Sequence, residues 1–196
     1  MKAADRIVKP SRGPRADAIR NRERVLEAAK LAFASVGADV SLEEIARRAG
    51  VGIGTLYRNF PTRDAIVEAV YRREVQHMAD TATRLMGERT PGDALHEWLR
   101  LSVAFVSTKK GMASALGSIA NADTELYAYS AELLTQTVDR LVRHAADSGD
   151  IRSDVEPGDI LRALTGFVYG NEHPGWEAST LRLIDILMDG LRTPRS

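Results

Sequence analysis

Residues 41–66 read SLEEIARRAGVGIGTLYRNFPTRDAI, and this stretch decides the fold. Ser41 and Glu44 have the spacing of a capping box, which starts a first helix. Gly50 stands where that helix should end in a left-handed residue, and Pro61 stops a second short helix. Two short helices joined by a turn of three or four residues that contains glycine predict a helix-turn-helix.

The second helix of this motif divides into an apolar stripe and a polar outer face. Helical spacing places Ile53, Leu56 and Phe60 on the stripe. The outer face carries small or hydrogen-bonding residues, which are Gly54, Thr55, Arg58 and Asn59, with Tyr57 at the edge. In the major groove of DNA, Arg pairs with guanine and Asn with adenine. The outer face therefore predicts contact with double-stranded DNA.

Longer amphipathic helices flank the motif. Apolar residues recur at three- and four-residue steps over residues 16–36, and Gly37 closes that helix. After the motif, Thr62 can cap a helix that runs from Arg63 to about Met86. At 1.5 Å per residue this helix is about 36 Å long, so we expect it to link the DNA-facing end mechanically to the body.

The remaining sequence predicts helices and no strands. Apolar periodicity and polar or glycine-bearing separators place helices at residues 91–108, 111–120, 124–146, 157–169 and 177–191. We therefore predict an all-α fold of about nine helices. It comprises a DNA-binding domain over residues 16–76, whose helix-turn-helix spans about residues 41–60, and a larger helical bundle over residues 77–196.

Charge is distributed unevenly along the chain. Lys plus Arg number 27 and Asp plus Glu number 27, so the formal net charge is zero. Residues 1–73 hold 15 basic and 9 acidic side chains, whereas residues 74–196 hold 12 and 18. This asymmetry predicts a basic segment that meets a polyanion and an acidic body that discourages anionic effectors.

Several classes of site are not expected. The chain has no Cys, so it forms no disulfides or thiolate metal sites, and its four His residues lack metal-ligand spacing. We predict neither a metal nor a cofactor. No apolar run could span a bilayer and no signal peptide is apparent, so a cytoplasmic protein without a membrane partner is expected.

The basic N-terminus, residues 1–15, is expected to form a flexible arm. Two interpretations of it remain open. The arm inserts Arg into the minor groove of DNA, or it is simply a disordered terminus.

Over residues 16–76, and above all over residues 41–66 quoted above, the sequence resembles the TetR family of one-component transcriptional regulators. Beyond residue 76 it fits that family only by the number and length of its helices. The resemblance implies a homodimer that binds a near-palindromic operator. The two recognition helices of such a dimer would sit about 34 to 36 Å apart on one DNA face.

The resemblance also implies roles for individual residues. Thr55 stands at a base- or phosphate-contacting position, Tyr57 at a phosphate-contacting one, and Arg58 and Asn59 at variable readout positions. Arg63 matches a basic residue that contacts phosphate at the start of the connecting helix. The full set expected at the DNA is Ser41, Arg47, Gly52, Gly54, Thr55, Tyr57, Arg58, Asn59 and Arg63. For Arg47, a merely solvated helix face is the alternative.

A small-molecule effector is expected in the body, since pockets between helices are common binding sites. The candidate lining residues are large and apolar or aromatic: Trp98, Leu101, Phe105, Met112, Leu126, Tyr127 and Phe167. The alternative is that these residues are ordinary core.

The last two helices are the candidates for dimerisation because both carry broad apolar faces. The residues on those faces are Leu164, Val168, Leu181, Ile184, Leu187 and Met188. The alternative is that these faces only close the protomer's own core.

The sequence thus predicts a homodimeric repressor that a small-molecule effector releases from DNA. An activator or a ligand-independent regulator of the same fold is the alternative. An enzyme is a remote one, because no phosphate-cradling glycine loop and no nucleophile elbow is present.

Overall fold

The computed structural model describes residues 14–120, 124–170 and 173–193. Within those residues it is all-α, as predicted, and the only β pairing is a single bridge between Ile151 and Arg192. The nine helices of the described residues are α1 (Pro14–Val36), α2 (Leu42–Ala49), α3 (Ile53–Asn59), α4 (Arg63–Glu88), α5 (Pro91–Gly111), α6 (Ala113–Ala120), α7 (Thr124–Asp147), α8 (Pro157–Tyr169) and α9 (Trp176–Leu191).

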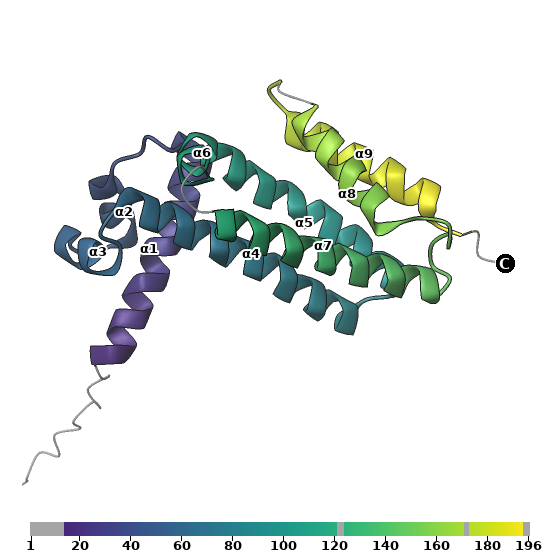
Figure 1. Ribbon diagram of the computed structural model, residues 1–196, viewed down its shortest axis with the longest axis horizontal. Helices are drawn as coiled ribbons and strands as arrows, with labels where there is room; N and C mark the ends of the chain where they lie inside the picture. Colours follow the sequence, from purple (N-terminus) through teal and green to yellow (C-terminus); the bar gives the residue numbers. More distant parts are fainter. Residues whose placement is uncertain (1–13, 121–123, 171–172, 194–196) are drawn as a thin grey trace, which may run out of the picture.

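The molecule is elongated, with α1–α3 gathered at one end (Figure 1). α4 runs from that end into the body, where it packs against α5 and α7. α8 and α9 pack against each other and cover α7 and α5. None of the described helices is both long enough and apolar enough to cross a membrane. The predicted arm, residues 1–15, lies outside the described residues except for its last two, which belong to the first turn of α1.

Local signals start and stop the helices around the turn. The Ser41 hydroxyl accepts a hydrogen bond from the N–H of Glu44, and Thr62 accepts one from Ala65 at the start of α4. Gly50 ends α2 at φ +63°, a left-handed conformation that favours glycine. The other half of the predicted capping box, in which Glu44 would accept from the Ser41 N–H, is replaced. The Glu44 carboxylate accepts hydrogen bonds from Arg47 instead.

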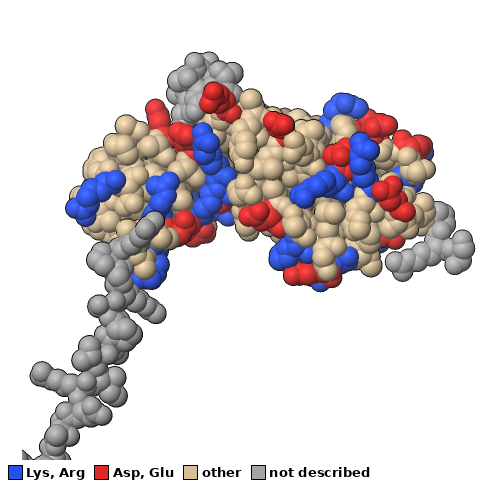
Figure 2. Space-filling view, turned by 60° about the horizontal axis from the view of Figure 1, so that its bottom comes forward, with Lys and Arg blue, Asp and Glu red and all other residues tan. Residues whose placement is uncertain are grey.

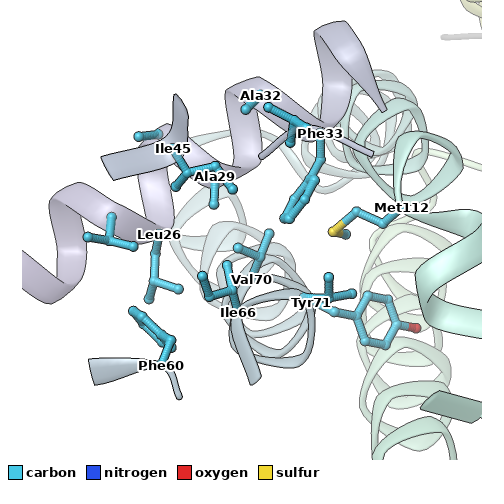
Figure 3. Packing of buried hydrophobic residues seen from close by; sticks show 14 of the residues in the cluster. Leu26, Ala29, Ala32, Phe33, Ile45, Phe60, Ile66, Val70, Tyr71 and Met112 are labelled. Carbon is cyan, nitrogen blue, oxygen red and sulfur yellow. The ribbon is translucent and has the colours of Figure 1, made fainter. Parts of the chain in front are cut away.

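Two clusters of buried apolar residues form the core. The first joins α1, α2 and α3 to the first half of α4, and Figure 3 shows Leu26, Phe33 and Phe60 among its members. The second fills the body from Met78 onward. The change from one cluster to the other falls within α4, between Val75 and Met78.

The two ends of the protein are nevertheless packed together. Met112, Leu116 and Leu126 come from the body but belong to the first cluster, so it extends beyond the predicted domain of residues 16–76. Gly111 makes this approach possible, since a Cβ atom there would overlap the backbone carbonyl of Phe33 in α1. The end of α5 is therefore in backbone contact with α1.

Candidate nucleic-acid interface and apolar cavity

The second helix of the helix-turn-helix, α3, packs against the core toward its C-terminal end and leaves its outer face exposed to solvent. Leu56 and Phe60 are buried, as their spacing predicts, whereas Tyr57 and Arg58 are exposed. Ile53 corrects the predicted stripe, because its side chain is 39% exposed. It is the first residue of a helix of only seven residues, and the core reaches only the later positions.

The polar side chains of Arg58 and Asn59 form their hydrogen bonds within α3. Arg58 Nη2 donates to Thr55 Oγ1 over 2.9 Å, and Asn59 Nδ2 donates to the Thr55 carbonyl over 2.8 Å. A guanidinium has five donors and an amide has two donors and an acceptor, so both side chains retain capacity for another partner. The arrangement presents hydrogen-bonding groups at the surface.

Two arginines of α1 fix the turn and the end of α3. The Arg22 guanidinium lies 4.4 Å from the centre of the Phe60 ring and donates over 3.4 Å to the carbonyl of Asn59. Arg24 donates over 3.1 Å to the carbonyl of Gly50. Sequence reasoning missed both residues, since periodicity shows only that they face outward from α1.

Ion pairs separate the basic side chains of the first 73 residues into two groups. Arg20, Lys30, Arg47, Arg48, Arg72 and Arg73 pair with carboxylates. Within the part of the chain that the structure describes, Arg22, Arg24, Arg58 and Arg63 form no such pair, and all four lie at or beside the turn. In the view of Figure 2, Lys and Arg lie over the α1–α3 end with several Asp and Glu beside them, and basic and acidic side chains also mingle over the opposite end.

Three other residues predicted at the DNA are engaged within the fold. The Ser41 oxygen is occupied by its cap. The exposed Arg47 forms two hydrogen bonds of 2.7 Å with Glu44, and with Arg48 it lowers the pKa of that carboxyl to about 2. Arg63 donates to the carbonyl of Ala38 and, over 2.6 Å, to that of Val40. Arg63 thus fastens the α1–α2 loop to α4, a role that the sequence did not predict.

The body contains an apolar cavity of about 130 Å³ between α4, α5, α7 and α8. It is lined by Met78, Trp98, Ser102, Phe105, Val106, Lys109, Leu134, Leu161, Leu164, Thr165, Val168 and Tyr169. Two residues predicted to bind a ligand, Trp98 and Phe105, are among them. The indole N–H of Trp98 donates over 2.9 Å to the carbonyl of Met78, which ties the cavity wall to α4.

The other predicted ligand residues lie elsewhere. Leu101 is 41% exposed, because it falls off the helical stripe on α5 that forms the wall. Met112 and Leu126 belong to the first core cluster, and the Tyr127 hydroxyl donates over 2.9 Å to the Leu116 carbonyl. Phe167 packs against the second cluster, as do Leu181 and Leu187, which were predicted at the dimer interface instead. The unpredicted wall residues on α5, which are Ser102, Val106 and Lys109, continue the stripe from Trp98 at steps of three and four residues.

Four residues predicted at a dimer interface are buried within the protomer. Ile184 and Met188 have almost no exposed surface, and Leu164 and Val168 line the cavity as part of the second cluster. This burial is what the alternative expects, in which these faces close the protomer's own core, and a role for the four residues at a dimer interface stays a prediction. The large apolar side chain that α9 does expose is Ile186, at 67%.

Comparison with known proteins assigns similarity to both halves of the chain. Residues 25–70 match the model of bacterial regulatory proteins of the TetR family. Residues 90–193 match the model of the C-terminal domain of SbtR-like transcriptional regulators. Together the two matches cover the helix-turn-helix and nearly all of the body.

Solved structures and a curated relative agree. A TetR transcriptional regulator from Streptomyces coelicolor is 41% identical, with a TM-score of 0.81 over 89% of this chain and 99% of that one. A TetR regulatory protein from Mycobacterium vanbaalenii is 35% identical, with a TM-score of 0.77 over 92% and 100%. A helix-turn-helix-type transcriptional repressor from Mycobacterium tuberculosis is 27% identical over 75% of this chain and 77% of its own length.

Proposed function

Because the chain belongs to the TetR family of DNA-binding transcriptional regulators, we propose that it is a homodimeric repressor that a small molecule releases from its operator. The observation that carries this proposal is the exposed polar face of α3, whose arginine has no carboxylate partner within the described residues. The family and the relatives are transcriptional regulators rather than enzymes. Similarity to a protein named as a repressor supports repression over activation.

Arg58 and Asn59 read base edges in the major groove in this proposal, while Thr55 and Tyr57 contact phosphates. Two glycines support a close approach of the α3 backbone to DNA. A Cβ atom added at Gly52 or Gly54 would meet nothing within 4 Å, so packing inside the protein does not require glycine there. Arg63 enters this proposal as a residue that positions the turn rather than as a phosphate contact.

Fluorescence anisotropy with DNA that flanks the encoding gene tests the assignment. Replacing Arg58 or Asn59 by Ala should change which sequences bind, at a cost of about 1–3 kcal/mol on the preferred one. Tyr57→Phe should weaken binding to all sequences equally. Arg143, an exposed arginine of α7, provides the matched control, and Arg143→Ala should leave binding unchanged. Unaltered affinity and selectivity of the Arg58 and Asn59 variants would refute the recognition-helix assignment.

For the dimer, we place the partner on the outward faces of α8 and α9. Ile186 supports this choice, because the side chain is large, apolar and two-thirds exposed, and burying it against a partner would lower the free energy of the assembly. Analytical ultracentrifugation should show a dimer that Ile186→Glu shifts toward monomer. Leu31→Glu changes a similarly exposed apolar residue on α1 and should not alter the oligomeric state. Equal sedimentation of all three proteins would contradict this placement.

Release from DNA follows in this proposal from the position of the cavity beside α4. Met78 lines the cavity, and the same helix begins at Arg63, next to α3. A ligand that fits only one position of α4 shifts the equilibrium between the bound and released states by its differential affinity.

A screen of small apolar compounds against the operator complex tests this step. Leu161→Trp, which fills the cavity, should abolish the effect of any releasing compound. In vitro transcription separates the alternatives, because a repressor lowers transcript yield and an activator raises it. Compounds that act equally on the Leu161 variant would place the effector elsewhere.

A further inference from the structure

We propose that the cavity takes a small apolar carboxylate, whose anionic group pairs with the ammonium of Lys109. The proposal names the ligand class for the site of the proposed function and therefore depends on that function for its regulatory consequence. The binding step itself can be measured without DNA.

Local charge in the cavity is opposite to that of the body around it. Residues 74–196 hold more acidic than basic side chains, which predicts that anions are discouraged. Among the described residues that line the cavity there is nevertheless one cation, Lys109, and no Asp or Glu. A ligand inside therefore meets a positive group and no carboxylate among the described lining residues. The net acidic charge of residues 74–196 does not describe this site.

Lys109 and its neighbour Lys110 are used differently. Lys110 Nζ donates over 2.7 Å to the carbonyl of Val168 and lies 4.2 Å from the centre of the Trp176 ring. Lys109 Nζ lies 5.9 Å from the centre of the Tyr71 ring, and no carboxylate pairs with it within the described ranges. Both cations suit the C-terminal end of α5. The helix dipole therefore accounts for a positive charge in the last turn of α5, but of these two lysines only Lys109 lines the cavity.

The hydroxyls of the wall narrow the chemistry further. Ser102 donates its hydrogen to the carbonyl of Leu99, and Thr165 donates to the carbonyl of Leu161. Since each hydroxyl has a single hydrogen, neither can also donate to a ligand. An ammonium has three donors and no acceptor, and a carboxylate has acceptors only. The ammonium of Lys109 thus complements a carboxylate, and the hydroxyl of Tyr169, which also lines the cavity, is a second group that can donate to one.

The size and lining of the cavity describe the remainder of the ligand. A cavity of about 150 Å³ in another protein holds benzene, so one of about 130 Å³ takes a single ring or a short acyl chain. Trp98 and Phe105 contribute aromatic surface, and Leu134 and Leu161 add aliphatic surface. Phenylacetate and hexanoate have this combination of size, apolarity and charge, and they serve as probes.

Isothermal titration calorimetry on the full chain compares these two acids with their neutral amides and with phenethylamine and hexylamine. We expect the acids to bind at least tenfold more tightly than the amides. A hydrogen bond to a charged group stabilises a complex more than a neutral one does, and the difference in free energy corresponds to about tenfold in affinity. The amines should not bind. Lys109→Met keeps the apolar stem and should abolish the preference for the acid, whereas Lys109→Arg should retain it.

Three results would overturn the proposal: amides that bind as tightly as acids, unchanged preference in Lys109→Met, or no binding of either acid at millimolar concentration. An unchanged thermal melt and operator affinity of Lys109→Met verify that the variant is folded. Operator release is recorded on the same samples. Acids that bind without releasing DNA would refute the proposed release from the operator through this cavity while leaving the ligand class intact.

Discussion

Replacing Lys30 by Met tests the charge pair that joins α1 to α4. Lys30 Nζ lies 2.7 Å from Glu74 Oε2, and the Glu74 side chain is only 6% exposed. Arg73 supplies a second cation 3.2 Å from the same carboxylate. Loss of one partner of a fully buried pair costs about 3–5 kcal/mol. Because Arg73 remains and Lys30 is partly exposed, we expect Lys30→Met to lower the free energy of unfolding by about 1–3 kcal/mol.

The reciprocal and double variants determine whether the pair itself is responsible. Glu74→Met leaves Lys30, which can turn toward water, so its cost should be smaller than that of Lys30→Met. The double variant leaves no buried carboxylate and should recover to within about 1 kcal/mol of the parent. The departure from additivity then measures the interaction of the two side chains.

Urea unfolding at one fixed protein concentration provides the measurement, with an unchanged m-value as the condition for comparing variants. Arg72 and Glu68 form the matched control, since they pair at 2.9 Å on the exposed side of α4. Arg72→Met should cost less than about 0.5 kcal/mol. If Lys30→Met costs no more than Arg72→Met, burial does not strengthen the link and the reasoning fails.

Three further predictions concern contacts at the α1–α3 end. Gly111→Ala should destabilise the protein by about 1–3 kcal/mol or more in thermal melts, because its Cβ overlaps Phe33, whereas the unobstructed Gly117→Ala should be neutral or stabilising. The Glu44 pKa of about 2 lies below its usual 4.5, so this carboxylate stabilises the protein above pH 4.5 and loses that effect as the pH falls toward 2. The stability difference between the parent and Glu44→Gln should shrink over that range, and a constant difference would contradict the assignment. Arg63→Ala should lower the melting temperature but leave unchanged the slope of log affinity for DNA against log salt concentration. A slope that is smaller by about one would instead indicate that Arg63 contacts a phosphate, as the sequence predicts.

The helix-turn-helix could be predicted because its signals are local. Ser41 caps a backbone N–H three residues away, and Gly50 adopts the left-handed conformation that ends a helix. Pro61 and Thr62 similarly separate α3 from α4. Each signal acts within about one helical turn, so the interacting residues are close neighbours in the sequence and can be recognised from their spacing.

The interactions that sequence reasoning missed join distant segments. Arg22 contacts Phe60 across 38 positions, and Gly111 meets α1 through backbone atoms that no residue pattern identifies. Leu164 and Val168 illustrate a different difficulty. Periodicity correctly marks their side of α8 as apolar, but it is silent on whether another helix of the same chain or a second chain covers that side.

The shortness of α3 has an evolutionary consequence. Seven residues are too few for a stable isolated helix, and packing of Leu56 and Phe60, with Arg22 over the ring, holds it in place. Arg58 is exposed, and among the described residues it hydrogen bonds only within its own helix turn. Mutations at this position therefore carry little penalty for folding. If the outer face reads the operator as proposed, substitutions there can change the preferred sequence while the buried anchors keep the fold intact.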